Sequence, residues 1–180
     1  MRGQWQAEEL IACWTLDEAD WRLLGNKTGA TRLGFALLLK FFELEGRFPR
    51  DPGELAAAAV DYVAGLVRVP SAELSRYGWS GRTIEYHRAQ IRDELGFREA
   101  SADDEQRLAE WLAEELGPVE LRVERLRDDL LARFRAERIE PSGSSRVERI
   151  LAPAERCSSA ASPAQSCSAY RPARSRGSRS

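Results

Sequence analysis

Signals that begin and end helices recur along most of the sequence, and this feature limits the fold more than any other. Ser101 with Asp104 forms a capping box, the pattern that satisfies free N–H groups at a helix start. Gly46 and Gly96 each follow an apolar helical repeat, at the place where a left-handed residue ends a helix. Strict apolar–polar alternation, which is typical of half-buried strands, is not sustained over any long stretch. The sequence therefore predicts an all-α fold, a multi-helix bundle.

The longest apolar run places one helix inside this bundle. Between residues 30 and 45, apolar side chains recur at i, i+3, i+4 and i+7, so most of this helix should be buried. Lys40 and Glu43 interrupt the run, which makes it too short and too polar to span a membrane. The other expected helices cover residues 7–14, 15–25, 52–67, 71–76, 81–95, 101–116 and 120–137, with a short one from about 145.

Composition excludes several classes of protein. With 43% apolar and 31% charged residues, the chain has the composition of a folded, soluble protein. The N-terminus lacks the apolar segment of a signal peptide, so we expect a cytoplasmic location without membrane contact. Three cysteines and the single histidine, His87, do not match a metal-ligand pattern, and residues 25–29 lack the spacing of a P-loop. We therefore expect no metal site and no cofactor.

The net charge of −2 conceals two different regions. Residues 1–150 contain 22 Lys and Arg against 28 Asp and Glu, whereas residues 151–180 contain five Arg against one Glu. Ser, Ala, Arg, Pro and Cys make up 25 of the last 30 residues, too little apolar surface to offset chain entropy, so we expect disorder there. The chain holds 25 Arg against two Lys, a sign of GC-rich coding DNA. We interpret the tail as the product of a frameshift after about residue 150.

Residues 51–98 contain a helix, a short helix, a turn and a second helix, an order typical of helix-turn-helix DNA-binding units. In the second helix, Ile84 and Ile91 share an apolar face, while Arg82 and Arg92 lie on the opposite face. Arginines on the outer face of such a helix pair with guanine in the major groove. A generic helical pair with solvated arginines explains the pattern equally well.

A second basic cluster surrounds the start of the helix over residues 30–45. Six Lys and Arg lie between residues 22 and 50, and Lys27 and Thr28 precede the free N–H groups of a helix N-terminus, which favour a phosphate. A capped turn with incidental charge is the alternative. Residues 99–118, by contrast, carry seven acidic residues against Arg107, and we expect that helix to face away from nucleic acid.

Four stretches resemble the N-terminal region of Tn-three family transposases, the class II replicative enzymes: residues 25–36, 86–92, 95–98 and 138–141. The resemblance spans residues 5 to about 150, a region known as a domain of unknown function at the transposase N-terminus. It implies a helical region with DNA-binding modules that recognise the transposon's terminal inverted repeats in double-stranded DNA. On the matching positions it favours, as DNA contacts, Lys27, Thr28, Arg32, Arg82, Arg88 and Arg92.

The resemblance also sets expectations for the whole chain. Nothing in the sequence matches the RNase-H-like domain that carries the family's acidic triad, so we expect a non-catalytic DNA-binding fragment and not an enzyme. The expected parts are a DNA-binding module at 1–50, a helix-turn-helix-like module at 51–98, further helices at 99–150 and the tail at 151–180. Two alternatives stay open. One is a helical protein-interaction or dimerisation module, whose partner is a second copy or a full-length transposase, and the other is a non-functional relic of a transposase gene.

Overall fold

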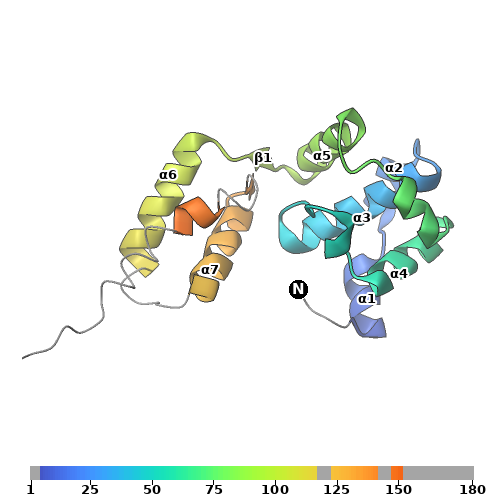
Figure 1. The fold of residues 1–180 in the computed structure, drawn as a ribbon, viewed down its shortest axis with the longest axis horizontal. Coiled ribbons are helices and arrows are strands. Elements are labelled where there is room, and N and C mark those ends of the chain that lie inside the picture. Colours follow the sequence, from blue (N-terminus) through green and yellow to red (C-terminus); the bar gives the residue numbers. More distant parts are fainter. Residues whose placement is uncertain (1–4, 117–122, 142–146, 152–180) are drawn as a thin grey trace, which may run out of the picture.

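The computed structural model describes residues 5–116, 123–141 and 147–151, and the regular structure in these ranges is almost entirely helical (Figure 1). The all-α prediction is confirmed. Residues 147–151 form a helical segment, and the tail from residue 152 lies outside the described residues. The remaining elements are, in chain order, α1 (Ala7–Trp14), α2 (Glu18–Leu24), α3 (Gly29–Glu45), η1 (Pro52–Glu54), α4 (Ala57–Val67), η2 (Ser71–Arg76), α5 (Arg82–Leu95), β1 (Arg98–Glu99), α6 (Ala102–Trp111), η3 (Leu112–Leu116), α7 (Val123–Ala136) and β2 (Ile139–Glu140).

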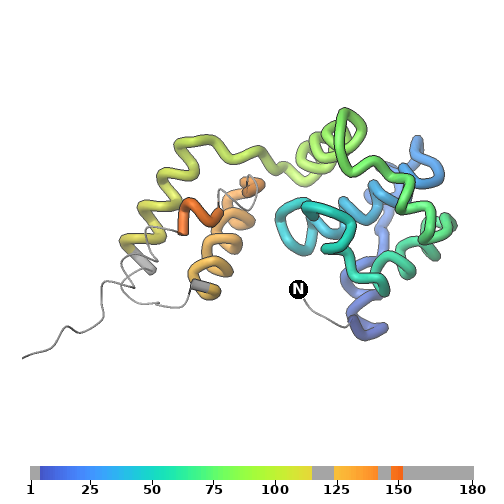
Figure 2. Tube along the Cα trace, in the orientation of Figure 1, coloured from blue at the N-terminus to red at the C-terminus, as the bar shows by residue number. Residues whose placement is uncertain are grey.

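Helix α3 is the centre of the first of two hydrophobic cores. Ten of its 17 residues are buried, because α1, α2, α4, α5 and η2 all pack against it. A helix that is apolar on nearly every side must be enclosed in this way. Lys40, which interrupts the apolar run, is buried as well and pairs with Asp20 on α2 and Glu43 on its own helix. Figure 2 shows this helix among the elements of the first body.

One close approach fixes η2 on α3. The Tyr77 ring, which directly follows η2, lies against Gly34, and a Cβ atom at that glycine would stand 2.4 Å from the ring. The Tyr77 hydroxyl in turn lies 2.7 Å from Nδ1 of His87 on α5. The buried Tyr77 thus joins α3, η2 and α5.

The second core consists of α6, η3, α7 and the segment 147–151. Leu108, Leu112, Leu130 and Phe134 are fully buried in it. Its first helix begins at the expected capping box, since Ser101 accepts a hydrogen bond from the Asp104 N–H and the Asp104 carboxylate accepts one from Ser101. The predicted segments 1–50 and 51–98 share the first core, whereas the segment from residue 100 belongs to the second.

A short parallel strand pair, which the sequence analysis did not predict, connects the two bodies. Arg98 of β1 pairs with Ile139 of β2, and Glu99 with Glu140. Two arginines near the end of α7 add contacts to the first body: Arg135 donates to the Leu44 carbonyl of α3 and Arg138 to the Leu95 carbonyl of α5. Both carbonyls belong to the last turn of a helix, where a positive charge is favourable.

The predicted helix-turn-helix-like unit stays a prediction. η2 packs on α3 and α4, while α5 packs on α3.

Within the described ranges, none of the helices is long and apolar enough to cross a membrane.

Candidate nucleic-acid interface

The start of α3 differs from the starts of α1, α2 and α6. Those three helices each carry two or three acidic residues in the first turn, together with a capping box. α3 has no acidic residue in its first turn, and its N-cap, Thr28, makes no side-chain cap bond. The first-turn N–H groups of α3 therefore keep the partial positive charge of a helix N-terminus.

A hollow of about 530 Å³ lies at this helix start. Its wall combines Thr28, Gly29 and Arg32 of α3 with Trp21 of α2 and residues 66–69 at the end of α4. The hollow is thus shared by three helices that the first core holds in place.

Two arginines bring formal positive charge to this hollow. The Arg32 guanidinium lies 5.4 Å from the centroid of the Trp21 ring, and its buried Nε atom has no hydrogen-bond partner among the described residues. Arg68 is the left-handed C-cap of α4, with φ 57°. It is exposed and makes no ion pair with any residue that the structure describes. Guanidinium groups beside free helix N–H groups are suited to a phosphate, because both donate hydrogen bonds to its oxygens.

The outer face of α5 provides a second exposed surface. Arg82 is the first residue of this helix and is exposed, and one helical turn later the Tyr86 ring is 64% exposed. The N-cap, Gly81, has φ 85° and no side-chain bond to the helix start. A positive charge at a helix N-terminus is unfavourable, and the carboxylate of Glu85 in the same turn offsets part of it.

A family model described as "Domain of unknown function (DUF4158)" matches residues 1–154. The chain belongs to the DUF4158 family. This domain is found at the N-terminus of Tn-three family transposases. The match contains every residue that the structure describes, so both bodies belong to the DUF4158 domain.

Lys27 of the DUF4158 domain is buried, which corrects its expected place on the surface. Its Nζ atom donates to the Leu23 carbonyl at 2.9 Å, to Asn26 Oδ1 at 3.1 Å and to Gln90 Oε1 at 3.0 Å. The ammonium group also lies 4.0 Å from the centroid of the Phe35 ring. Burial lowers the pKa of Lys27 below its usual range. All three ammonium protons have acceptors, so Lys27 attaches the turn before α3 to α5.

Arg92 is not on an open face of α5 as the helical pattern predicted. Its side chain is 17% exposed, and its two terminal nitrogens lie 2.7 Å from Glu99 and 2.7 Å from Glu140. Both carboxylates come from the strand pair, which covers the C-terminal part of α5. Helical periodicity within α5 contains no information about a strand 48 residues away, which is why the sequence misplaced this arginine.

Arg88 is half-buried between α5 and the segment after α3. Its guanidinium lies 5.4 Å from the centroid of the Phe48 ring and donates to the Pro49 carbonyl, while its Nε atom is buried without a hydrogen-bond partner in the described residues. Arg88 therefore faces a different region from Thr28 and Arg32.

The six expected contacts thus separate into three groups. Thr28 and Arg32 meet at the α3 hollow and Arg82 lies on the outer face of α5, whereas Lys27, Arg88 and Arg92 make internal contacts. Sequence reasoning missed Arg68, which reaches the hollow only through the packing of α4. It also missed Tyr86, although the helical wheel that placed Arg82 outside places Tyr86 on the same side.

Proposed function

We propose that this DUF4158 domain binds double-stranded DNA and recognises the terminal inverted repeats of a transposon, as a non-catalytic N-terminal part of a class II transposase. The observation that carries the proposal is the hollow at the start of α3. There an uncapped helix N-terminus without acidic residues lies beside Arg32 and Arg68. This combination is suited to a backbone phosphate, and the family match associates the domain with transposases.

The proposed recognition has two components. Phosphate contacts at the α3 hollow fix the position of the duplex, and the outer face of α5, with Arg82 and Tyr86, supplies contacts to the bases. The acidic first turn of α6 would repel DNA, but it belongs to the second body and not to the wall of the hollow.

The test is fluorescence anisotropy of the full chain with two labelled duplexes, one carrying the terminal inverted repeat of a Tn-three family transposon and one with the same bases scrambled. We expect tighter binding to the repeat and a marked loss of affinity between 50 and 200 mM salt, because each phosphate contact releases counterions. Equal affinity for the two duplexes would contradict recognition of the repeat.

Two variants locate the interface. Arg32→Gln and Arg68→Gln should each weaken binding several-fold on both duplexes, because each removes a phosphate contact without altering base recognition. The control is Arg76→Gln on η2, since Arg76 is 75% exposed and pairs only with Glu73 among the described residues. Equal affinities for all four proteins would remove the α3 hollow from the interface.

A second candidate is a protein-interaction or dimerisation module. One observation favours it: residues 1–150 have six more acidic than basic residues, and this excess of negative charge opposes binding to DNA. Sedimentation equilibrium of the full chain separates the candidates, because a dimer that does not bind either duplex supports this second function.

A further inference from the structure

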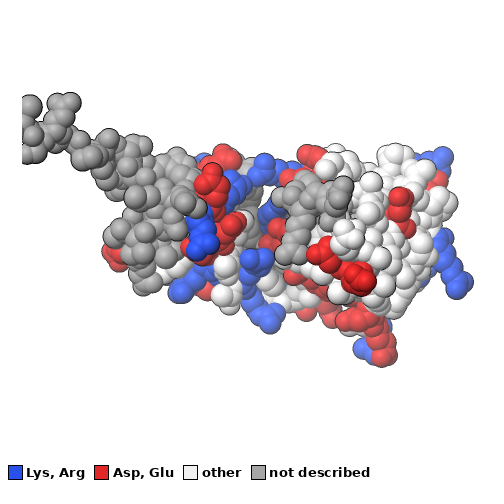
Figure 3. Space-filling view, turned by 90° about the horizontal axis from the view of Figure 1, so that it is seen from below, with Lys and Arg blue, Asp and Glu red and all other residues white. Residues whose placement is uncertain are grey.

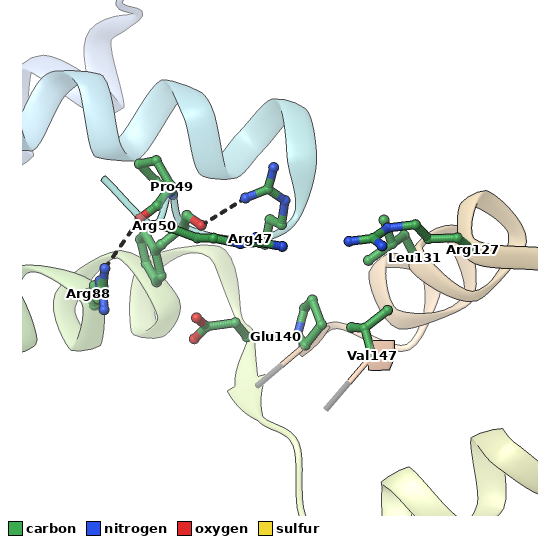
Figure 4. A pocket seen from close by; sticks show the side chains of 10 residues that line it. Arg47, Pro49, Arg50, Arg88, Arg127, Leu131, Glu140 and Val147 are labelled. Atoms are coloured by element: carbon green, nitrogen blue, oxygen red, sulfur yellow. Dashed lines mark hydrogen bonds between the residues drawn. The ribbon is translucent and has the colours of Figure 1, made fainter. Parts of the chain in front are cut away.

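A pocket of about 220 Å³ lies between the two bodies, away from the α3 hollow (Figure 4). The first body contributes Arg47 and Arg50 from the segment after α3, together with Arg88 from α5. The second body contributes Arg127 of α7 and Glu140 of β2. In Figure 4 the Arg127 side chain extends from α7 toward Arg47, and Figure 3 shows Lys and Arg side chains together with Asp and Glu side chains where the bodies meet.

The arginines of this pocket have few carboxylate partners. Arg47 and Arg50 share one carboxylate, Glu54, at 2.7 Å and 3.6 Å. Arg88 has a buried Nε atom without a hydrogen-bond partner, and Arg127 makes no ion pair with a residue that the structure describes. The carboxylate in the pocket wall, that of Glu140, already pairs with Arg92. The pocket therefore has an excess of positive charge that its own side chains do not neutralise.

Glu54 and Glu140 neutralise only part of the charge of these four arginines, since Glu140 is shared with Arg92, and the remaining like charges repel each other unless a further anion lies between them. The space is large enough for a tetrahedral oxyanion, since a water molecule occupies about 30 Å³. A phosphate carries one negative charge as a backbone diester and up to two as a free phosphate, and its tetrahedrally arranged acceptor oxygens can pair with planar guanidinium groups from opposite sides.

We propose that this pocket is a second phosphate site, in which Arg127 of the second body and Arg47, Arg50 and Arg88 of the first body bind one phosphate group. Such a phosphate joins the two bodies, because its oxygens pair with side chains of both. It belongs either to the backbone of a nucleic acid or to a free phosphate compound. The site is independent of the α3 hollow. A failure of the proposed function would therefore not overturn the proposed phosphate site.

The test is the thermal stability of the full chain in rising concentrations of inorganic phosphate, with chloride keeping the ionic strength constant. Bound phosphate stabilises the folded state, so the melting temperature should rise with phosphate and not with chloride. Arg127→Gln should weaken phosphate binding at least fivefold, and Arg76→Gln, which removes an exposed arginine of η2, should leave it unchanged. Arg50→Gln, which changes a side chain that is 53% exposed, is a second variant with little risk to the fold.

The outcomes are distinct. A phosphate-dependent shift that both pocket variants reduce supports the site, while no shift in the unaltered chain, or a full shift in both variants, overturns it. The source of the phosphate follows from the duplex experiment. Weaker duplex binding by Arg127→Gln assigns the pocket to a backbone phosphate, and unchanged duplex binding with a lost phosphate shift assigns it to a free phosphate compound.

Discussion

His87 illustrates how a single buried side chain depends on its neighbours. Its ring lies edge-on to Phe35 at 5.1 Å between centroids, and its Nδ1 atom shares a hydrogen bond with the Tyr77 hydroxyl. Burial lowers the pKa of His87 to about 4, and the charge of Lys27 acts in the same direction. The neutral imidazole is therefore a structural group that joins α5 to the residue after η2.

This pKa predicts a pH-dependent stability. The unfolded chain binds a proton at His87 near pH 6.5, whereas the folded chain binds it only near pH 4. Stability is therefore complete above pH 6.5, and the His87 contribution decreases as the pH falls toward 4. Between pH 7.5 and 5 the free energy of unfolding should fall by about 2 kcal/mol. Urea denaturation at several pH values measures this change, and since the chain has one histidine, His87→Gln should remove it.

Lys27 gives a second prediction at the scale of single residues. Lys27→Met keeps the length of the side chain but leaves three acceptors without their donor, so the free energy of unfolding should fall by about 2 kcal/mol. At a temperature where the variant is folded, its affinity for the duplex should equal that of the unaltered chain. A stable variant with tenfold weaker DNA binding would instead make Lys27 the phosphate contact that its sequence position suggested.

At the scale of elements, local sequence signals predicted where most helices lie but not which elements pack against one another. The capping box at Ser101 and the left-handed glycines Gly46 and Gly96 lie where the sequence placed helix ends. Asp51 caps only the three-residue turn η1, and α4 begins later, at Ala57, because Leu55 has an extended backbone. The strand pair joins residues about 40 positions apart, and a two-residue strand leaves no alternating pattern to detect.

The contact between α3 and η2 predicts opposite effects for two glycine substitutions. An alanine in place of a helical glycine normally stabilises a protein by about 1 kcal/mol. Gly65→Ala on α4 should do so, since a Cβ atom there has no neighbour within 4 Å. Gly34→Ala should instead destabilise by about 2 kcal/mol or more, because its Cβ atom would overlap the Tyr77 ring. Thermal unfolding of the two variants measures both signs, and a stabilised Gly34→Ala would contradict the close packing.

At the scale of the whole molecule, two cores meet through a few polar contacts. The Arg92 pairs with Glu99 and Glu140, the strand pair, and the arginine–carbonyl bonds of Arg135 and Arg138 all lie at this junction. Apart from the Arg92–Glu99 pair, these contacts join residues more than 40 positions apart in the sequence, so helical periodicity does not predict them. The candidate site has the same limits: the helix-start pattern indicated Thr28, the family resemblance indicated Arg32, and Arg68 reaches the hollow only through the fold.

The junction gives a prediction for Arg92. Arg92→Gln leaves the Glu140 carboxylate, whose pKa burial already raises, without its partner, and should cost about 2 kcal/mol. The loss should be local. The amide hydrogens of Arg98 and Ala100, which bond to the Arg138 and Glu140 carbonyls, should exchange with solvent faster, while amides of α3 keep their protection. Unchanged exchange at both positions would show that the strand pair does not need this ion pair.

The central position of α3 also has a consequence for synthesis. Its last residue is Glu45, but the helices that cover it include α4, η2 and α5, and the last of these ends at Leu95. Ribosomes add roughly 5–20 residues per second, so this strongly apolar helix leaves the ribosome several seconds before its cover is complete. During that interval α1 and α2 shield only part of it, and the nascent chain offers chaperones their clearest binding segment.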